Sequence, residues 1–166
     1  MAKDKTIYTI GYGNDPPEAF LQRLVDAGIE LVVDVRRRGS KARLGCYAPS
    51  EYTNMGIASL LDEHAIGYKW ALSLGNWFRV TKSRTLEDSL DAYDAWLQME
   101  LKKKKMQHVF FSIMWEINQY HRQTAFLCCE KKAMKAGHWN CHRGIAAEKI
   151  ADALGYSGDE WSVEHL

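Results

Sequence analysis

The chain has 166 residues, of which 46% are hydrophobic and 26% are charged, and its formal net charge at pH 7 is +1. This composition is ordinary for a globular domain with a buried core, and the near-zero charge excludes a general electrostatic attraction of the whole chain to nucleic acid. No apolar run approaches the roughly 18 residues of a membrane span. No apolar leader precedes the first predicted strand, so we expect a cytoplasmic protein forming a single domain over residues 1–166.

The first predicted elements are a strand, a helix and a second strand. Residues 6–10 are mostly β-branched or aromatic and are followed by a glycine-rich turn, which indicates a strand. A helix is predicted over residues 16–28, because Pro and Glu lie in its first turn and apolar residues recur at helical spacing. Residues 31–35 are an apolar run interrupted only by Asp34, which is typical of a parallel strand buried on both faces.

The middle of the chain is predicted to be largely helical. The capping-type residues Ser50, Thr53 and Asn54 precede a predicted helix that ends near His64, and residues 67–72 are predicted to form a strand. Residues 86–121 have a helical pattern, and the lysine run at 102–105 marks a break between two helices. Within the second helix, the apolar residues Val109, Ile113 and Ile117 recur every four positions and predict a buried stripe.

The last predicted elements are a strand over residues 124–128, a helix from Cys141 to Gly155 and a short strand over residues 161–166. Strands that alternate with helices favour parallel pairing with right-handed crossovers. The predicted fold class is therefore α/β, with a mostly parallel sheet of about five strands and helices on both faces, a Rossmann-like three-layer arrangement.

Ligands of open parallel sheets bind beyond the carboxyl ends of the strands. The residues predicted to lie there are Tyr12, Gly13 and Asn14 after the first strand, Asp34 and Arg36 at the second, Gly75, Asn76 and Trp77 after the third, and Cys128, Cys129 and Glu130 at the fourth, with Cys141-His142-Arg143 entering from the loop before the last helix.

Cys141 is the candidate nucleophile of this edge. It lies at a predicted helix N-terminus beside His142 and Arg143, and each of these features favours a thiolate. The N–H groups of the helix start could bind an anion, with Arg36 and Arg143 holding a phosphate or carboxylate. The alternative is that Cys141 packs against the sheet and Arg143 forms an internal ion pair.

Asp34 and Glu130 are candidate proton carriers. A carboxylate in an apolar strand is costly unless it is paired. Asp34 could therefore act as an acid or base, bind a ribose-type hydroxyl, or form a structural ion pair with Arg36 or Arg143. Glu130 has the same alternatives.

A metal or cofactor site around Cys128, His138 and Cys141 is a further alternative. Together with Cys129 and His142, these residues supply ligand types that zinc uses, and we expect the four cysteines of the chain to be reduced thiols. However, the spacing matches no familiar zinc pattern, and adjacent side chains of a strand point to opposite faces. No resident metal is therefore assigned from the sequence.

Two basic segments flank the predicted site. The first carries Arg36, Arg37, Arg38, Lys41 and Arg43, and the second carries Arg79, Lys82 and Arg84 beside Trp77 and Phe78. Basic residues interleaved with aromatic ones suit stacking on a base while phosphates are held. The alternative is that these segments are solvated loops.

Five short motifs occur in order along the chain: Thr9-Ile10-Gly11-Tyr12, Asp34-Val35-Arg36, Leu74-Gly75, Cys128-Cys129-Glu130 and Cys141-His142-Arg143. In this series the chain resembles domain of unknown function family 488. The resemblance covers nearly the whole chain and implies an α/β domain, but it implies no established reaction. Three departures from the family pattern are Tyr12 in place of a common His, Asn76 in place of a second Gly, and a longer loop before Cys141.

The residues favour an enzyme that acts on an anionic, phosphate-bearing substrate, nucleotide-like or derived from nucleic acid. Cys141, Asp34 and Glu130 are the predicted catalytic residues, and the predicted substrate-binding residues are Tyr12, Asn14, Arg36, Trp77, His142 and Arg143. A non-catalytic module that binds a nucleotide or nucleic acid is the alternative. The sequence identifies no cofactor and no oligomeric state.

Overall fold

The computed structural model describes residues 5–37, 44–49, 55–78, 80–120, 122–130, 134–135, 138–139, 141–156 and 160–166, with the side chains of 134, 135, 138 and 139 left aside. The elements, in chain order, are β1 (Thr6–Gly11), α1 (Pro17–Asp26), β2 (Leu31–Asp34), η1 (Gly45–Tyr47), α2 (Gly56–Asp62), β3 (Gly67–Trp70), η2 (Leu72–Leu74), α3 (Leu86–Glu100), α4 (Lys104–Tyr120), β4 (Thr124–Cys128), β5 (Met134–Lys135), β6 (His138–Trp139), α5 (His142–Gly155) and β7 (Ser162–His165).

The main sheet has five strands in the order β3-β2-β4-β1-β7, and every pairing within it is parallel. Gly11 lies opposite Cys128, while Asp34 lies opposite Leu127 on one side and Trp70 on the other. The last residues of four strands therefore lie along one edge of the sheet, as the sequence predicts.

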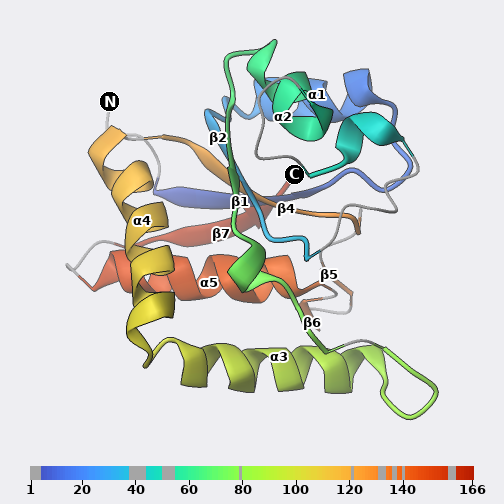
Figure 1. The fold of residues 1–166 in the computed structure, drawn as a ribbon. Coiled ribbons are helices and arrows are strands. Elements are labelled where there is room, and N and C mark those ends of the chain that lie inside the picture. Colours follow the sequence, from blue (N-terminus) through green and yellow to red (C-terminus); the bar gives the residue numbers. More distant parts are fainter. Residues whose placement is uncertain are drawn as a thin grey trace.

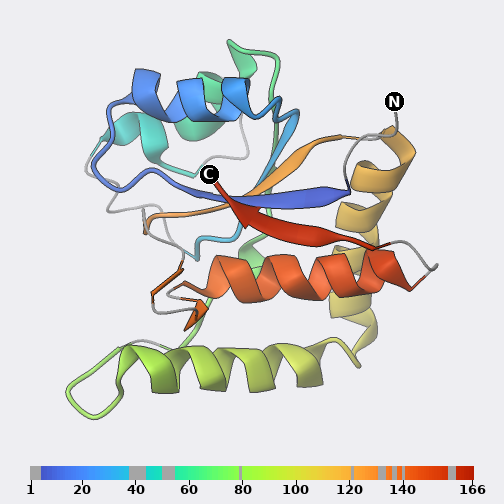
Figure 2. The same cartoon turned by 180° about the vertical axis from the view of Figure 1, so that it is seen from behind.

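Helices cover both faces of this sheet (Figure 1). Strand residues Ile10, Val32 and Leu127 pack with α1 and α2, whereas Val33 and Phe126 pack with α3, α4 and α5. The two sets alternate along each strand because successive side chains point to opposite faces. The predicted three-layer α/β fold is confirmed, and the view from behind shows α5 lying along the sheet beneath β7 (Figure 2).

The helical middle of the chain has the predicted break, since α3 ends at Glu100 and α4 begins at Lys104. Ile113 and Ile117 are buried as expected, and Val109 is partly buried against the same core. The Thr85 hydroxyl accepts from the Asp88 N–H and the Asp88 carboxylate accepts from the Thr85 N–H, which caps the start of α3.

Two segments differ from the predictions, and one prediction lies outside the described residues. β3 ends at Trp70, because residues 72–74 form a short 3-10 helix that buries Leu74. A two-stranded antiparallel hairpin, β5 with β6, lies in the segment predicted as a loop before Cys141. The helix that follows η1 is described from residue 56, so the predicted capping residues Ser50, Thr53 and Asn54 lie outside the described residues. Among the described residues, no helix has the length and apolar character needed to cross a membrane.

The connections around β4 create the place where a ligand could enter. The chain leaves β1 and β2 towards α1 and α2 on one face of the sheet, whereas it leaves β4 towards α5 on the other (Figure 1). β4 lies between β1 and β2 in the sheet. The chain therefore leaves β4 towards one face of the sheet and leaves both neighbouring strands towards the other face. Such a switch point opens a crevice at the carboxyl edge of a parallel sheet, and Cys128 is the last residue of β4.

Gly11, the last residue of β1, permits the close approach of the main chain that follows β4. A Cβ atom at this position would overlap the carbonyl oxygen of Glu130 and crowd the Arg143 guanidinium. We therefore expect Gly11→Ala to lower the free energy of unfolding by about 3 kcal/mol, because backbone must move to admit the methyl group.

Urea denaturation measures this effect, and Gly155→Ala at the end of α5 is the matched control because an added Cβ there meets nothing within 4 Å. Equal stability of the two variants would contradict the packing described for Gly11.

Candidate functional site

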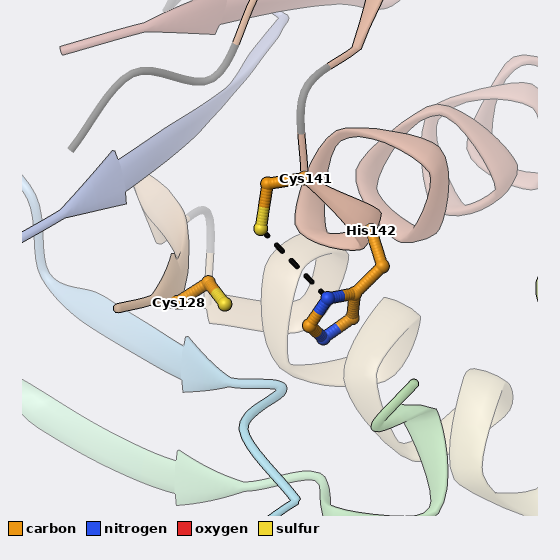
Figure 3. A group of neighbouring side chains, drawn as sticks. All are labelled: Cys128, Cys141 and His142. Atoms are coloured by element: carbon orange, nitrogen blue, oxygen red, sulfur yellow. Dashed lines mark hydrogen bonds between the residues drawn. The ribbon is translucent and has the colours of Figure 1, made fainter. Parts of the chain in front are cut away.

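Three side chains from two elements meet at the carboxyl edge of β4. Cys128 ends β4, Cys141 is the N-cap residue of α5 and His142 is its first residue. Their ligand atoms, the two Sγ and a ring nitrogen of His142, all lie within 4.8 Å of one another. Figure 3 shows the two sulfur atoms and the imidazole turned towards a common space.

The hydrogen bonds of His142 determine which ring nitrogen carries the proton. Nε2 lies 3.0 Å from the Val35 carbonyl oxygen, and a carbonyl can only accept, so Nε2 is the protonated nitrogen. Burial lowers the pKa of His142, so the ring is neutral near pH 7. Its Nδ1 therefore presents a lone pair, 3.8 Å from the Cys141 Sγ. The ring orientation is further fixed by Tyr93, which contacts it edge to face.

The pKa of Cys141 is lowered even though the side chain is buried. The largest cause is the hydrogen bond from the Cys128 thiol; burial opposes it, and the positive charge and backbone N–H of Arg143 add to it. The last two contributions are of the kind expected from the helix start and from Arg143. Burial lowers the pKa of His142, so its neutral ring adds no positive charge beside the sulfur.

The neighbouring thiols have the opposite shift. Cys129 favours the thiolate of Cys128, but the hydrogen bond to Cys141 and burial outweigh it and raise the Cys128 pKa. The Cys129 pKa is raised by its hydrogen bond with Cys128, whose Sγ is 4.0 Å from its own, and by burial. Cys141 is therefore the thiol of the three that most readily becomes a thiolate.

Asp34 and Arg36 form a buried ion pair, which was one of the alternatives for Asp34. The carboxylate accepts from the backbone N–H, Nε and Nη2 of Arg36 and from the Tyr68 hydroxyl. The Arg36 Nη1 donates to the Tyr47 carbonyl, 2.6 Å away. Asp34 is fully buried and Arg36 is 4% exposed. Both groups are thus directed at partners within the protein.

Arg143 is fully buried, and its Nη1 donates to the main-chain carbonyl of Glu130. Glu130 itself is exposed. The contact that joins these two predicted site residues is therefore made by the main chain of Glu130, and it holds the start of α5 beside the segment that leaves β4. The predicted clamp of Arg36 and Arg143 around an anion is not formed in this conformation, since both guanidinium groups contact protein acceptors.

Tyr12 and Asn14 line a different part of the same sheet edge. The Tyr12 ring stacks on Tyr47 with centroids 4.3 Å apart, and the Arg36 guanidinium lies 5.2 Å from the Tyr12 centroid. A cavity of about 300 Å³ at this place is lined by Tyr12, Gly13, Asn14, Asp15, Pro16, Leu44 and Tyr47.

Trp77 lies in a second cavity of about 280 Å³ together with Trp96, Met106 and Val109. The Arg37 guanidinium lies over the half-exposed Trp77 ring, 3.4 Å from the ring centroid. Arg38, Lys41, Arg43 and Arg79 of the predicted basic segments lie outside the described residues, as does the side chain of His138.

Sequence reasoning missed two contributors to the site, Tyr47 and Tyr68, which are the partners of Arg36 and Asp34. It offered Cys129, His138 and His142 as possible ligands beside Cys128 and Cys141, and the structure brings the His142 imidazole to the two thiols. The alternation of side chains along β3 could have indicated Tyr68, because only the side chains on one face of that strand lie on the same side of the sheet as Asp34.

Comparison of the chain with family models, with curated proteins and with solved structures finds no match. The resemblance to domain of unknown function family 488 therefore stays a prediction from the five motifs.

Removing one partner of the Asp34–Arg36 pair should be strongly destabilising. Arg36→Ala leaves a fully buried carboxylate without its counter-charge, for which we expect a loss of about 3–5 kcal/mol in the free energy of unfolding. Tyr68→Phe removes one hydrogen bond from the same carboxylate and should cost about 1–2 kcal/mol.

Denaturation curves in urea measure both losses, and Lys82→Ala on an exposed segment is the control. If Arg36→Ala were as stable as Lys82→Ala, the pair would not have the structural role assigned to it.

Proposed function

We propose that the protein is an enzyme whose reactive group is the Cys141 thiolate, acting on an anionic, phosphate-bearing substrate. One observation carries the proposal: the thiol with the lowered pKa faces the unprotonated nitrogen of His142 at the N-terminus of α5. A thiol beside a base with an available lone pair is the arrangement that nucleophilic catalysis requires.

The chemistry of the dyad has a defined proton path. His142 Nδ1 takes the proton of the Cys141 thiol, and the sulfur electron pair then forms a bond to an electrophilic phosphorus or carbon while the leaving group departs with its own pair. The Val35 carbonyl accepts from Nε2 throughout, so it orients the ring and stabilises the imidazolium.

The anionic character of the substrate rests on the charge around the thiol. α5 has 14 residues, and its N-terminus carries the positive end of the helix dipole. Arg143, two residues after Cys141, adds a full positive charge that lowers the pKa of the thiol. In a buried environment these charges act through a low effective dielectric constant, so they favour an incoming anion more than surface charges would.

Binding of a nucleotide or nucleic acid without catalysis is the second candidate. It is favoured by the stacked pair of Arg37 and Trp77, a cation and a half-exposed indole at the same sheet edge. Such binding would weaken steeply with salt and would not change when Cys141 is replaced by Ser.

The acidity of Cys141 can be tested directly. The thiolate ultraviolet absorbance of the protein, minus that of Cys141→Ser, should rise with pH through a midpoint below the roughly 8.5 of an unperturbed thiol. Cys128→Ala removes the largest favourable contact and should move the midpoint upward, whereas Cys46→Ser in η1 should leave it in place.

A Cys141 midpoint at or above that of a free cysteine would contradict the proposed nucleophile. A Cys141 midpoint that is unchanged by Cys128→Ala would instead show that Cys128 does not lower the pKa of Cys141.

Protection by phosphate tests the substrate class. Orthophosphate should slow the alkylation of Cys141 by iodoacetamide, because an anion held at the start of α5 lies across the path to the sulfur. Peptide mass spectrometry follows Cys141 separately from the exposed Cys129, which serves as the internal control. Sodium chloride at equal ionic strength should give no protection of Cys141. Equal protection by the two salts would argue against an anionic substrate at this thiol.

A further inference from the structure

We propose that Cys128 Sγ, Cys141 Sγ and His142 Nδ1 form a binding site for a single Zn²⁺ ion, with a fourth position left to water. The inference goes beyond the proposed catalysis, because it concerns which ion these three atoms bind and does not require any turnover. It starts from the clustering of the three ligand atoms within 4.8 Å of one another.

The spacing of the atoms fits a tetrahedral ion. Zn–S bonds of about 2.3 Å and Zn–N bonds of about 2.0–2.1 Å place neighbouring ligand atoms roughly 3.5–3.8 Å apart. The Cys141 Sγ to His142 Nδ1 distance is 3.8 Å, and no pair in the cluster exceeds 4.8 Å. Side-chain adjustments of about 1 Å or less would bring all three atoms to bonding distance of one ion.

The imidazole is already in the tautomer that a metal needs. Its Nε2–H donates to the Val35 carbonyl, so the Nδ1 lone pair points at the sulfur atoms (Figure 3). A ligand histidine almost always donates its other N–H to a carbonyl or carboxylate, which fixes the ring and strengthens the ligand. The partner comes from the residue after β2, so the orientation is set by the fold and not by α5 alone.

The donor set selects the kind of ion. Two sulfur ligands and one imidazole favour a borderline-soft ion such as Zn²⁺ over Mg²⁺ or Ca²⁺, which prefer oxygen. Two thiolates also balance the two positive charges of the ion, which reduces the cost of placing it in a site where both cysteines are buried. Three protein ligands leave one tetrahedral position open, as in zinc sites that bind water or substrate.

Occupation by Zn²⁺ and the use of His142 as the base for Cys141 exclude each other on one molecule, because both need the single lone pair of Nδ1. The ion-bound form would hold Cys141 as a ligand, and removal of the ion would release the thiol beside His142. Metal binding and thiol acidity are therefore measured by separate experiments, and either can fail alone.

Cobalt substitution of the protein tests the site. After treatment with a chelator, Co²⁺ should bind one per chain and give thiolate-to-cobalt charge-transfer bands together with the visible bands of a tetrahedral ion. Zn²⁺ should then displace the colour at one equivalent. Cys128→Ser and Cys141→Ser nearly preserve the side-chain shape, and each should weaken binding by more than the roughly 10–100-fold that loss of an outer-shell partner costs.

Cys46→Ser is the matched control, because it removes a free thiol that lies outside the cluster, and it should bind as the unchanged protein does. Circular dichroism checks that each variant is folded, and His142→Gln provides a third variant that leaves both thiols in place. Cobalt bound without charge-transfer bands, or with unchanged affinity in the folded Cys128→Ser and Cys141→Ser proteins, would overturn the proposal.

Discussion

The hydrogen bond from the buried Arg143 guanidinium to the Glu130 carbonyl fixes the start of α5 beside the end of β4. It is possible only because Gly11 has no Cβ, so β1 can approach both groups. The guanidinium thereby satisfies a main-chain acceptor at the sheet edge while its charge lies next to the Cys141 sulfur. One interaction thus joins the packing of β1, β4 and α5 to the electrostatics of the site.

The second buried arginine has a different task, although both lie at the same edge. Arg36 neutralises Asp34 and closes the turn that follows β2, so the pair contributes little net charge to its surroundings. Trp70 donates to the Arg36 carbonyl and Tyr68 donates to the Asp34 carboxylate, which connects β3 to this turn. A pair so fully hydrogen-bonded offsets the cost of burying it, whereas the positive charge of Arg143 acts on Cys141 and lowers the pKa of that thiol.

Much of the fold could be predicted from the sequence, because it depends on local periodicity. The apolar run at 31–35 is typical of a buried strand, and the apolar residues that recur every four positions in α4 indicate a helix. Parallel pairing of the strands then places their carboxyl ends at one edge of the sheet. The short hairpin of β5 and β6 has no such pattern. Its two-residue strands are too brief for alternation to be detected.

The partners within the site could be predicted less well, since they depend on contacts between distant segments. The sequence offered Arg36 and Arg143 equally as partners of Asp34, and only the path of the turn selects Arg36. The proton position on His142 depends on Val35, which is 107 residues away. Residue types and their order therefore indicate where reactive side chains lie in the fold, but not which ring nitrogen of His142 has an available lone pair.

That lone pair decides what the edge of β4 can do. If Nε2 of His142 were unprotonated, the ring would present an N–H to Cys141 and could neither accept its proton nor bind a cation through Nδ1. The Val35 carbonyl prevents this, because it can only accept a hydrogen bond. A single main-chain oxygen after β2 thus makes the imidazole face the thiols with its lone pair. With Zn²⁺ bound between the three side chains, the imidazole would be a ligand; without the ion, it would be the base for Cys141.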